Sequence, residues 1–216
     1  MPADLDLHIR PAGTWDAPVV AGLLAATLLH PALSRWLILP ADVRSRQLAA
    51  WADALTAERL RARAIRVADD GGTIIGASVW ATCPDNAPAL PTPLARLQPA
   101  PGHEPRWHTS RDQIGQRHPR RAHQHLLALG VQAGRHRQGI GAALLTDWQQ
   151  HLRPAGLPYH LLAPGPMFTI ASRAGYHTLG APITLGVVSL PVMWLLTPAG
   201  TSPDLDDPAR AGAGAW

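Results

Sequence analysis

The segment Arg135–Ala142, which reads Arg-His-Arg-Gln-Gly-Ile-Gly-Ala, constrains the fold of this chain more than any other part of its sequence. The residues before it, 123–132, are largely apolar and predict a buried strand, and the pattern over 139–152 predicts a helix. Small residues between a strand and a helix let backbone N–H groups approach a pyrophosphate, and the helix dipole points its positive end at the same charge. The segment therefore predicts an anion cradle built from backbone.

The spacing of the glycines argues against two common nucleotide sites. The segment has no Gly-Lys-Ser/Thr ending, which phosphate loops of the Walker type require, and it lacks the three spaced glycines of dinucleotide-binding folds. Coenzyme A, which also carries a pyrophosphate, is the better ligand. On spacing alone, a tight strand-to-helix turn without a ligand stays an equally good interpretation.

The composition limits the classes of protein to which this chain can belong. A chain of 216 residues, 46% hydrophobic and 16% charged, suits one packed domain. The net charge of +4 is carried by 19 basic residues that are all arginine, which coding bias explains as well as a nucleic-acid partner does, so we expect no nucleic acid. The first residues carry two acids, and no apolar run approaches the roughly 18 residues of a membrane span, so we expect a cytoplasmic protein without membrane contact.

Hydrophobic periodicity predicts alternating strands and helices over most of the chain. We expect strands at 7–10, 65–68, 73–82, 123–132 and 159–163, and closing strands within 183–196. We expect helices at 16–29, 41–64, 139–152 and 167–174. Residues 84–119 predict a long connection with one short helix near Leu94, and residues 198–216, rich in Pro, Ala, Gly and Asp, predict a disordered tail.

These features together resemble the GNAT superfamily of N-acetyltransferases. Its pyrophosphate motif, Gln/Arg-x-x-Gly-x-Gly/Ala after a strand that ends in valine, is similar to residues 126–131 and 136–145, with His136 at the usual Gln/Arg position. The run Arg173-Ala174-Gly175-Tyr176 matches part of the late Glu-Arg-x-Gly-Phe signature. The order of the segments looks most like the actinobacterial subgroup of puromycin N-acetyltransferase and related small-molecule enzymes.

The resemblance implies an α/β (α+β) GNAT fold over residues 1–197, with a central mixed twisted sheet of about six to seven strands, flanked by helices and splayed at the acyl-CoA site. It implies acetyl-CoA, or another acyl-CoA, as co-substrate, a small-molecule acceptor, and a monomer or homodimer. The residues that it assigns to coenzyme A are Leu129, Gly130, Val131, His136, Arg137, Gln138, Gly139, Ile140, Gly141 and Ala142.

Two histidines are candidates for proton transfer. His123 and His125 alternate on the predicted strand, so their side chains share one face, and an imidazole titrates near neutral pH. The pair resembles the His-x-His of arylalkylamine N-acetyltransferases, and we name His125 as the base, with His123 second. The alternative is a pair of solvent-facing or hydrogen-bonded histidines. No convincing third ligand accompanies them in sequence, so we expect no metal.

The usual general acid of the family is missing. Ala171 stands where many relatives have a tyrosine, and Met167 stands at the usual asparagine, which leaves the hydroxyls of Ser172 and Thr169 as substitutes. The acceptor side of the fold is predicted to include tryptophans that would suit an aromatic or amphipathic amine, although core packing also explains them. These tryptophans are Trp36, Trp80 and Trp107.

The resulting hypothesis is an acetyl-CoA-dependent N-acetyltransferase for the amine of a small molecule, in antibiotic resistance or secondary-metabolite biosynthesis. Direct attack in a ternary complex is expected, because the single Cys83 lies far in sequence from the motifs and cannot form an internal disulfide. Two alternatives stay open. One is different acyl-CoA chemistry on the same scaffold, namely another acyl group, O-acylation or decarboxylation, and the other is a non-catalytic acyl-CoA-binding protein.

Overall fold

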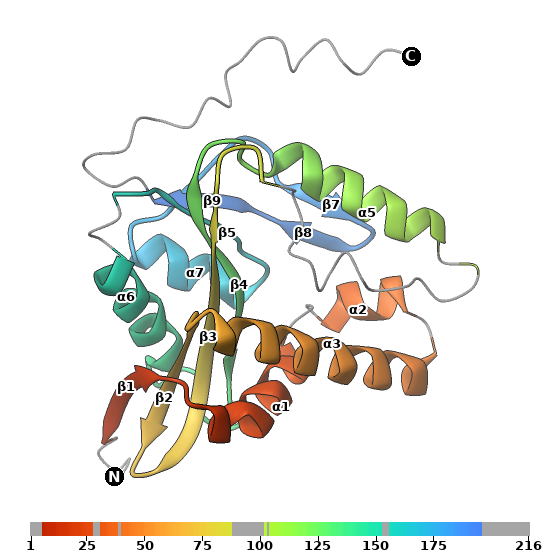
Figure 1. Cartoon of the computed structure of the whole chain (residues 1–216). Helices are drawn as coiled ribbons and strands as arrows, with labels where there is room; N and C mark the ends of the chain where they lie inside the picture. Colours follow the sequence, from red (N-terminus) through yellow and green to blue (C-terminus); the bar gives the residue numbers. More distant parts are fainter. Residues whose placement is uncertain are drawn as a thin grey trace.

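A mixed seven-stranded sheet forms the centre of the fold (Figure 1). The computed structural model describes residues 6–27, 31–38, 40–87, 102, 104–152 and 156–195. Within these ranges the strand order is β1-β2-β3-β4-β5-β9-β6, and every neighbouring pair is antiparallel except β4 and β5. The strands are β1 (Leu7–Pro11), β2 (Ile65–Asp70), β3 (Thr73–Cys83), β4 (His123–Val131), β5 (Tyr159–Leu162), β6 (His177–Thr178) and β9 (Val192–Leu195). The predicted fold class is confirmed.

A separate hairpin, β7 (Ile183–Leu185) with β8 (Val188–Leu190), was not expected as a second sheet. The described helices are η1 (Thr14–Asp16), α1 (Ala17–Thr27), α2 (Pro31–Leu37), α3 (Ala41–Arg61), α5 (Glu104–Arg117), α6 (Ile140–Leu152) and α7 (Pro166–Arg173). Within the described residues, no single helix has the length and hydropathy of a membrane span; the bent pair Thr14–Thr27 and Pro31–Leu37 meets both criteria only when the two are taken together.

Helices α1 and α3 cover one face of the sheet (Figure 1). Val20 and Leu24 on α1, and Trp51 and Leu55 on α3, recur at the i, i+4 spacing that places apolar side chains on one side of a helix. All four are buried against β3, where Val79 is fully buried. This packing fixes α1 beside β4 as well, so that the end of β4 lies under a helix.

Helices α6 and α7 cover the opposite face (Figure 1). Leu145 and Trp148 of α6 are buried against Trp80 of β3. A bidentate ion pair adds to this packing, since Nε of Arg66 on β2 lies 2.7 Å and Nη2 lies 2.9 Å from the carboxylate of Asp147 on α6. The helix that follows the glycine segment is therefore fastened to the sheet by both apolar contacts and charge.

The predicted long connection over residues 84–119 is wrong in its second part, because α5 occupies Glu104–Arg117. The helix is polar and buries only a narrow stripe, formed by Trp107 and Ser110 with Ile114 half-buried. Those three positions have the i, i+3, i+7 spacing of a helix, and this is the signal that could have revealed it. Leu94, where a short helix was predicted, and the predicted tail at 198–216 lie outside the described residues.

Strands β4 and β5 separate after a short paired stretch. Their described pairing consists of Gln124 with Tyr159 and His125 with His160, and β4 continues to Val131 beyond it. On the other side of β4, Val79 pairs with Ala128 and Trp80 pairs with Leu126, so Leu127 is the extra residue of a bulge. The predicted splay of the sheet is thus present, and it begins at His125.

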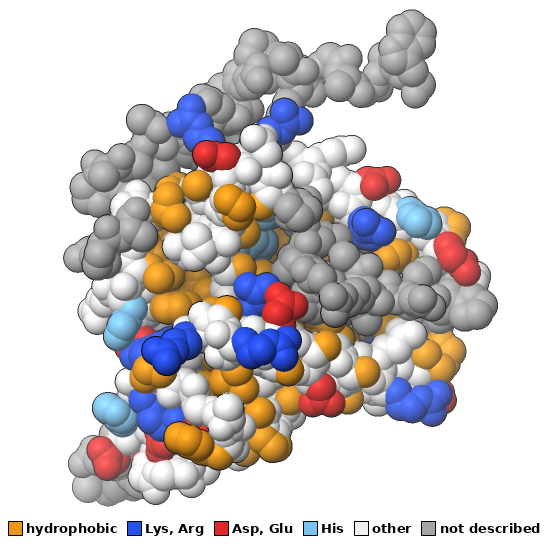
Figure 2. All heavy atoms as spheres, in the orientation of Figure 1, with side chains coloured by type: hydrophobic (Ala, Val, Ile, Leu, Met, Phe, Trp, Pro, Cys, Tyr) orange, Lys and Arg blue, Asp and Glu red, His pale blue; other side chains and the backbone are white. Residues whose placement is uncertain are grey.

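Charged side chains are interspersed on the surface. Figure 2 shows arginines spread over the visible face, with acidic and apolar side chains between them rather than in one continuous basic area. The exposed pair Arg46–Asp42 and the partly buried pair Arg10–Asp16 are examples of arginines that already have a carboxylate partner.

Candidate functional site

The glycine segment places backbone N–H groups at the surface beside the splay. The first hydrogen bond into α6 runs from the amide of Ala143 to the carbonyl of Gly139, at 2.9 Å. The N–H groups of residues 140–142 come before this first bond and therefore have no acceptor within the helix. Gly139 has φ +83°, a left-handed conformation that suits glycine, and open space surrounds the place where a Cβ would stand. Residues 136–139 are exposed, so this backbone fits the predicted pyrophosphate cradle.

Two side chains hold the segment to the sheet. The imidazole of His136 hydrogen bonds to the carbonyl of Val131, with 3.1 Å between Nε2 and O. Nη2 of Arg135 lies 3.1 Å from Oδ2 of Asp70 on β2. His136, which stands at the family's Gln/Arg position, is thus engaged with the end of β4, while Arg137 and Gln138 are exposed. The side chain of His136 therefore holds the segment to the end of β4.

The remaining residues predicted to bind coenzyme A have contacts within the fold. Leu129 and Val131 pack beside α6, and Gly141 is buried at its first turn. Gly130 faces α1: a Cβ there would lie 2.7 Å from Oγ1 of Thr27 and 3.2 Å from the carbonyl oxygen of Leu23. The close packing of α1 therefore explains why position 130 is a glycine, without any ligand.

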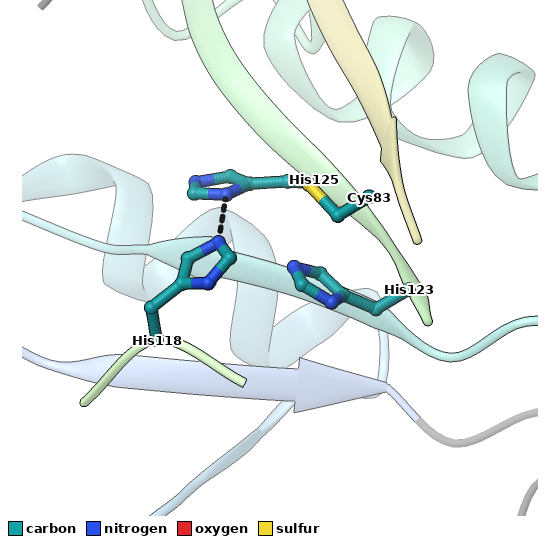
Figure 3. A group of neighbouring side chains, drawn as sticks. All are labelled: Cys83, His118, His123 and His125. Atoms are coloured by element: carbon teal, nitrogen blue, oxygen red, sulfur yellow. Dashed lines mark hydrogen bonds between the residues drawn. The ribbon is translucent and has the colours of Figure 1, made fainter. Parts of the chain in front are cut away.

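The two predicted catalytic histidines lie in a buried group of four histidines. His123 and His125 project from one face of β4, and His118 comes from the segment after α5 (Figure 3). His160 comes from β5, where it pairs with His125. In this order, the four residues have exposed fractions of 0%, 7%, 4% and 2%, which excludes the interpretation of solvent-facing histidines. The ring centroids of His125 and His160 are 4.7 Å apart, and those of His118 and His123 are 4.8 Å apart. The sequence did not indicate His118 or His160.

A hydrogen bond assigns the proton of one ring. Nδ1 of His123 lies 2.7 Å from the carbonyl oxygen of Arg121 and therefore donates, which leaves a lone pair on Nε2. Among the described residues this Nε2 has no hydrogen-bond partner, and neither ring nitrogen of His160 has one. Nε2 of His118 lies 3.2 Å from Nδ1 of His125, so one of these two nitrogens carries the proton between them.

Burial keeps these imidazoles neutral. It lowers the pKa of His118 to about 4, with a further decrease from His123 and an opposing effect of the Pro119 carbonyl. Burial also lowers the pKa of His123, and it lowers those of His125 and His160 well below the ordinary value. At neutral pH the group therefore presents unprotonated nitrogens, as both proton acceptance and metal coordination require.

Cys83, which is far from the motifs in sequence, lies beside these histidines in the fold. It pairs with His123 across β3 and β4, and its Sγ lies within 4.8 Å of ligand nitrogens of His118, His123 and His125. The fold places two further potential ligands beside the histidine pair, Cys83 and His118, which the sequence did not indicate. Burial raises the pKa of the Cys83 thiol, opposed by the positive charge of Arg59, so the resting side chain is a thiol rather than a nucleophilic thiolate.

Two of the predicted acceptor-side tryptophans, Trp36 and Trp107, pack in one apolar cluster, and the third lies in another. Trp80 is fully buried and packs edge-on against Trp148, on the face covered by α6, so it is a core residue in this structure. Trp107 is a residue of α5, and its side chain is buried. Trp36 is half-buried under the guanidinium of Arg106, which lies 5.6 Å from its ring centre. The structure does not bring the three side chains together.

The hydroxyls proposed as substitutes for the missing acid are exposed. Ser172 and Thr169 lie on the outward side of α7, whereas Ala171, at the usual tyrosine position, is fully buried. Helix α7 packs on the face of the sheet opposite the four histidines, so Ser172 and His125 are not brought together. Tyr176 is also buried on the α7 side, and burial raises its pKa.

No family model matches the chain, and no curated protein sequence does. Solved structures match its fold. One, described as histone acetyltransferase HPA2 and related acetyltransferase from Corynebacterium glutamicum, has 23% identity and a TM-score of 0.64 over 91% of this chain and 99% of that one. A polyamine N-acetyltransferase of Drosophila melanogaster has 15% identity and a TM-score of 0.61, over 89% of this chain and 100% of that one.

A GNAT family acetyltransferase from Brucella melitensis, in complex with acetyl-CoA, has 17% identity and a TM-score of 0.50, over 92% of this chain and 93% of that one. The chain therefore has the fold of GNAT acetyltransferases. The splayed β4–β5 pair and the glycine segment before α6 lie within this shared fold. The actinobacterial subgroup with puromycin N-acetyltransferase stays a prediction.

Proposed function

We propose that this protein is an acetyl-CoA-dependent N-acetyltransferase that acetylates the amine of a small molecule. One observation carries the proposal: β4 connects a surface cradle for an anion at one end to buried, neutral histidines at the other, with the splay beginning between them. An acyl transferase needs these three features, because it must hold a charged carrier, admit a thioester and accept a proton.

The exposed backbone around Gly139 would hold the pyrophosphate of coenzyme A. Its exposed residues, 136–139, lie at the positive end of α6, and free N–H groups at a helix N-terminus are the physical basis of anion binding there. Beyond His125, β4 continues to Val131 without described pairing to β5. Backbone donors in that stretch, around residues 129–131, are the candidates for holding the thioester carbonyl.

His125 is the proposed base, because it is neutral and lies where β4 and β5 diverge. The acceptor ammonium loses a proton to the imidazole, its nitrogen attacks the thioester carbon, and the C–N bond forms as the C–S bond breaks. Coenzyme A leaves as a thiolate, which takes up the second proton of the attacking nitrogen as the neutral amide forms; the low basicity of the thiolate makes a strong acid dispensable. His123, with its unpartnered Nε2, is the second candidate, and Ser172 has no part in the proposal.

A small acceptor with one amine and an apolar body suits these surroundings. The Drosophila enzyme with this fold forms N-acetylagmatine, which supports a small amine as the acceptor class. Of the few acids in the acceptor segments, Asp85 accepts from the amide of Ala122 and Asp42 pairs with Arg46, so these two are already engaged. A cytoplasmic monomer or homodimer in antibiotic resistance or secondary metabolism stays a prediction.

Binding and turnover test the proposal separately. Calorimetric titration with acetyl-CoA should give saturable one-to-one binding, and a dissociation constant above about 1 mM would contradict it. Thiol release across a panel of amines should then show turnover that falls about 100-fold or more in His125→Ala. His177→Ala, at an exposed histidine of β6, is the matched control and should keep the wild-type rate.

The missing acid supports a second candidate. Ala171 leaves the helix after β5 without the usual tyrosine, so a reaction other than acetyl transfer to an amine is the alternative. Assays with longer acyl-CoA thioesters and with alcohols would reveal it. Tight binding without turnover of any of these would favour a non-catalytic acyl-CoA-binding protein.

A further inference from the structure

Four potential ligand atoms converge on one point at the ends of β3 and β4 (Figure 3). Sγ of Cys83 and one ring nitrogen each of His118, His123 and His125 all lie within 4.8 Å of one another. In a tetrahedral zinc site, with Zn–N of about 2.0–2.1 Å and Zn–S of about 2.3 Å, neighbouring ligand atoms are about 3.3–3.6 Å apart. Nε2 of His118 and Nδ1 of His125 already lie 3.2 Å apart. The other two atoms lie within 4.8 Å of these, so they would move closer when an ion binds all four.

The tautomer of His123 suits coordination. Nδ1 of His123 is held by the Arg121 carbonyl, so its Nε2 carries a lone pair inside the protein, where it has no described partner. His118 similarly interacts with the backbone of Pro119. Ligating histidines usually bond a carbonyl or carboxylate through their second nitrogen, which fixes the ring toward the metal. The orphaned Nε2 of His123, fully buried, is otherwise a polar atom without compensation.

The four side chains are mostly buried, and three of them lie on the paired strands β3 and β4. Cys83 and His123 lie opposite each other on paired strands, and His125 is two residues further along β4. The three histidines are buried, and Cys83 is half-buried, which leaves one side through which an ion can reach the group. The positive charge of Arg59, which acts on Cys83, is paired with Glu58.

We propose that Cys83, His118, His123 and His125 bind one divalent transition-metal ion, for which zinc is the best fit. The four donors are a thiolate and three imidazoles without any carboxylate, a set that suits zinc and disfavours magnesium and calcium. Binding releases one proton, that of the Cys83 thiol, as the S–Zn bond forms, and the proton between His118 and His125 moves to a ring nitrogen that does not bind the ion. The four side chains then fill the coordination shell, so the ion would link the segment after α5 to strands β3 and β4. This goes beyond the proposed function.

Cobalt(II) is the probe for the test, because it occupies zinc sites and its absorption reports coordination geometry and thiolate ligation. The full-length protein is stripped with a chelator and titrated without acyl-CoA or amine, so the outcome is independent of any transferase activity. We expect one cobalt ion per chain, intense visible bands typical of a tetrahedral site, a sulfur-to-cobalt band in the near ultraviolet, and displacement by one equivalent of zinc.

Two ligand variants and one matched control locate the site. Cys83→Ser should remove the sulfur-to-cobalt band, and both it and His118→Asn should weaken zinc binding about 100-fold or more. His108→Asn makes the same change at an exposed position of α5 and should bind as wild type. Zinc should raise the melting temperature of wild type and of His108→Asn, but not that of Cys83→Ser.

Three results would overturn the site. They are the absence of saturable one-to-one binding, the weak bands of an octahedral ion, and equal zinc affinity in Cys83→Ser and His108→Asn. Because His118 is buried, its variant is first checked by circular dichroism without metal. If it does not fold, Cys83→Ser, which changes one half-buried atom, decides the matter alone.

Discussion

Nε2 of His118 lies 3.2 Å from Nδ1 of His125, and this contact joins the segment after α5 to strand β4. The same two residues belong to the proposed metal site, and His125 is the proposed base. One imidazole cannot coordinate an ion within a filled shell and accept a proton from the acceptor in the same cycle. The proposed base and the proposed metal site therefore need the same imidazole of His125. The effect of a metal ion on the rate of acetyl transfer tests both proposals.

Zinc is expected to inhibit acetyl transfer. With an amine that the enzyme turns over, stoichiometric zinc should lower the rate at least about 10-fold, since coordination occupies the base. Adding a chelator should restore the rate. Magnesium is the matched control and should have no effect, because thiolate and imidazole are poor ligands for it. A zinc-loaded enzyme with the full rate would show that His125 is not both base and ligand.

Gly139→Asp should weaken acetyl-CoA binding without unfolding the protein. Aspartate tolerates the left-handed conformation better than most residues, no atom lies near the added Cβ, and a carboxylate at a helix N-terminus is favourable for the helix. Its charge would, however, repel a pyrophosphate. We expect affinity to fall at least about 10-fold, a loss of about 1.4 kcal/mol, as measured by calorimetry.

The control for this change is Gly139→Asn, which has nearly the same shape and no charge. It should bind acetyl-CoA more tightly than Gly139→Asp, and the difference between the two should shrink at high salt. Equal affinities in the two variants would mean that the pyrophosphate does not lie at this loop.

Gly130→Ala should destabilise the fold, whereas Gly22→Ala should stabilise it. A Cβ at Gly130 would press on Thr27 and on the backbone of Leu23, and such overpacking costs about 1–3 kcal/mol. Gly22 is exposed on α1 with open space around it, so alanine there should gain about 0.5–1 kcal/mol of helix propensity. Urea unfolding of both variants measures the two effects, and equal midpoints would contradict the close approach of α1 to β4.

Asp16→Asn should lower stability in a pH-dependent way. Asp16 is buried, and hydrogen bonds from Arg10 first and from the Gly13 amide lower its pKa against the opposing effect of burial. Because the folded pKa is below the ordinary value of 3.8, the ionised carboxylate stabilises the fold above that pH, and this contribution is lost as the pH falls through the folded pKa. We expect a loss of about 2–3 kcal/mol at pH 7, measured by urea unfolding.

The matched change is Asp42→Asn, which breaks an exposed pair with Arg46 and should cost about 0.5 kcal/mol or less. In strong acid the wild type and Asp16→Asn should approach each other in stability, because both then lack the charge. A constant difference across the acid range would show that ionisation of Asp16 is not the source of its effect.

The sequence by itself determined the features that depend on local pattern. Apolar runs and glycine spacing located β4 and α6, with the glycine segment between them, within a residue or two, and alternation along a strand placed His123 and His125 on one face. These inferences succeed because strand and helix periods, and the left-handed conformation at Gly139, are properties of neighbouring residues. A polar helix such as α5 was missed because its buried stripe is narrow.

Only the tertiary structure decided which distant residues join the histidines of β4. Cys83 faces His123 through the register of β3 on β4, and His160 reaches His125 through the parallel β4–β5 pair. His118 arrives from the end of α5. Register and helix docking are set by side-chain packing summed over the whole sheet, including the bulge at Leu127. No short stretch of sequence encodes that sum, so the four ligand atoms meet only in the folded chain.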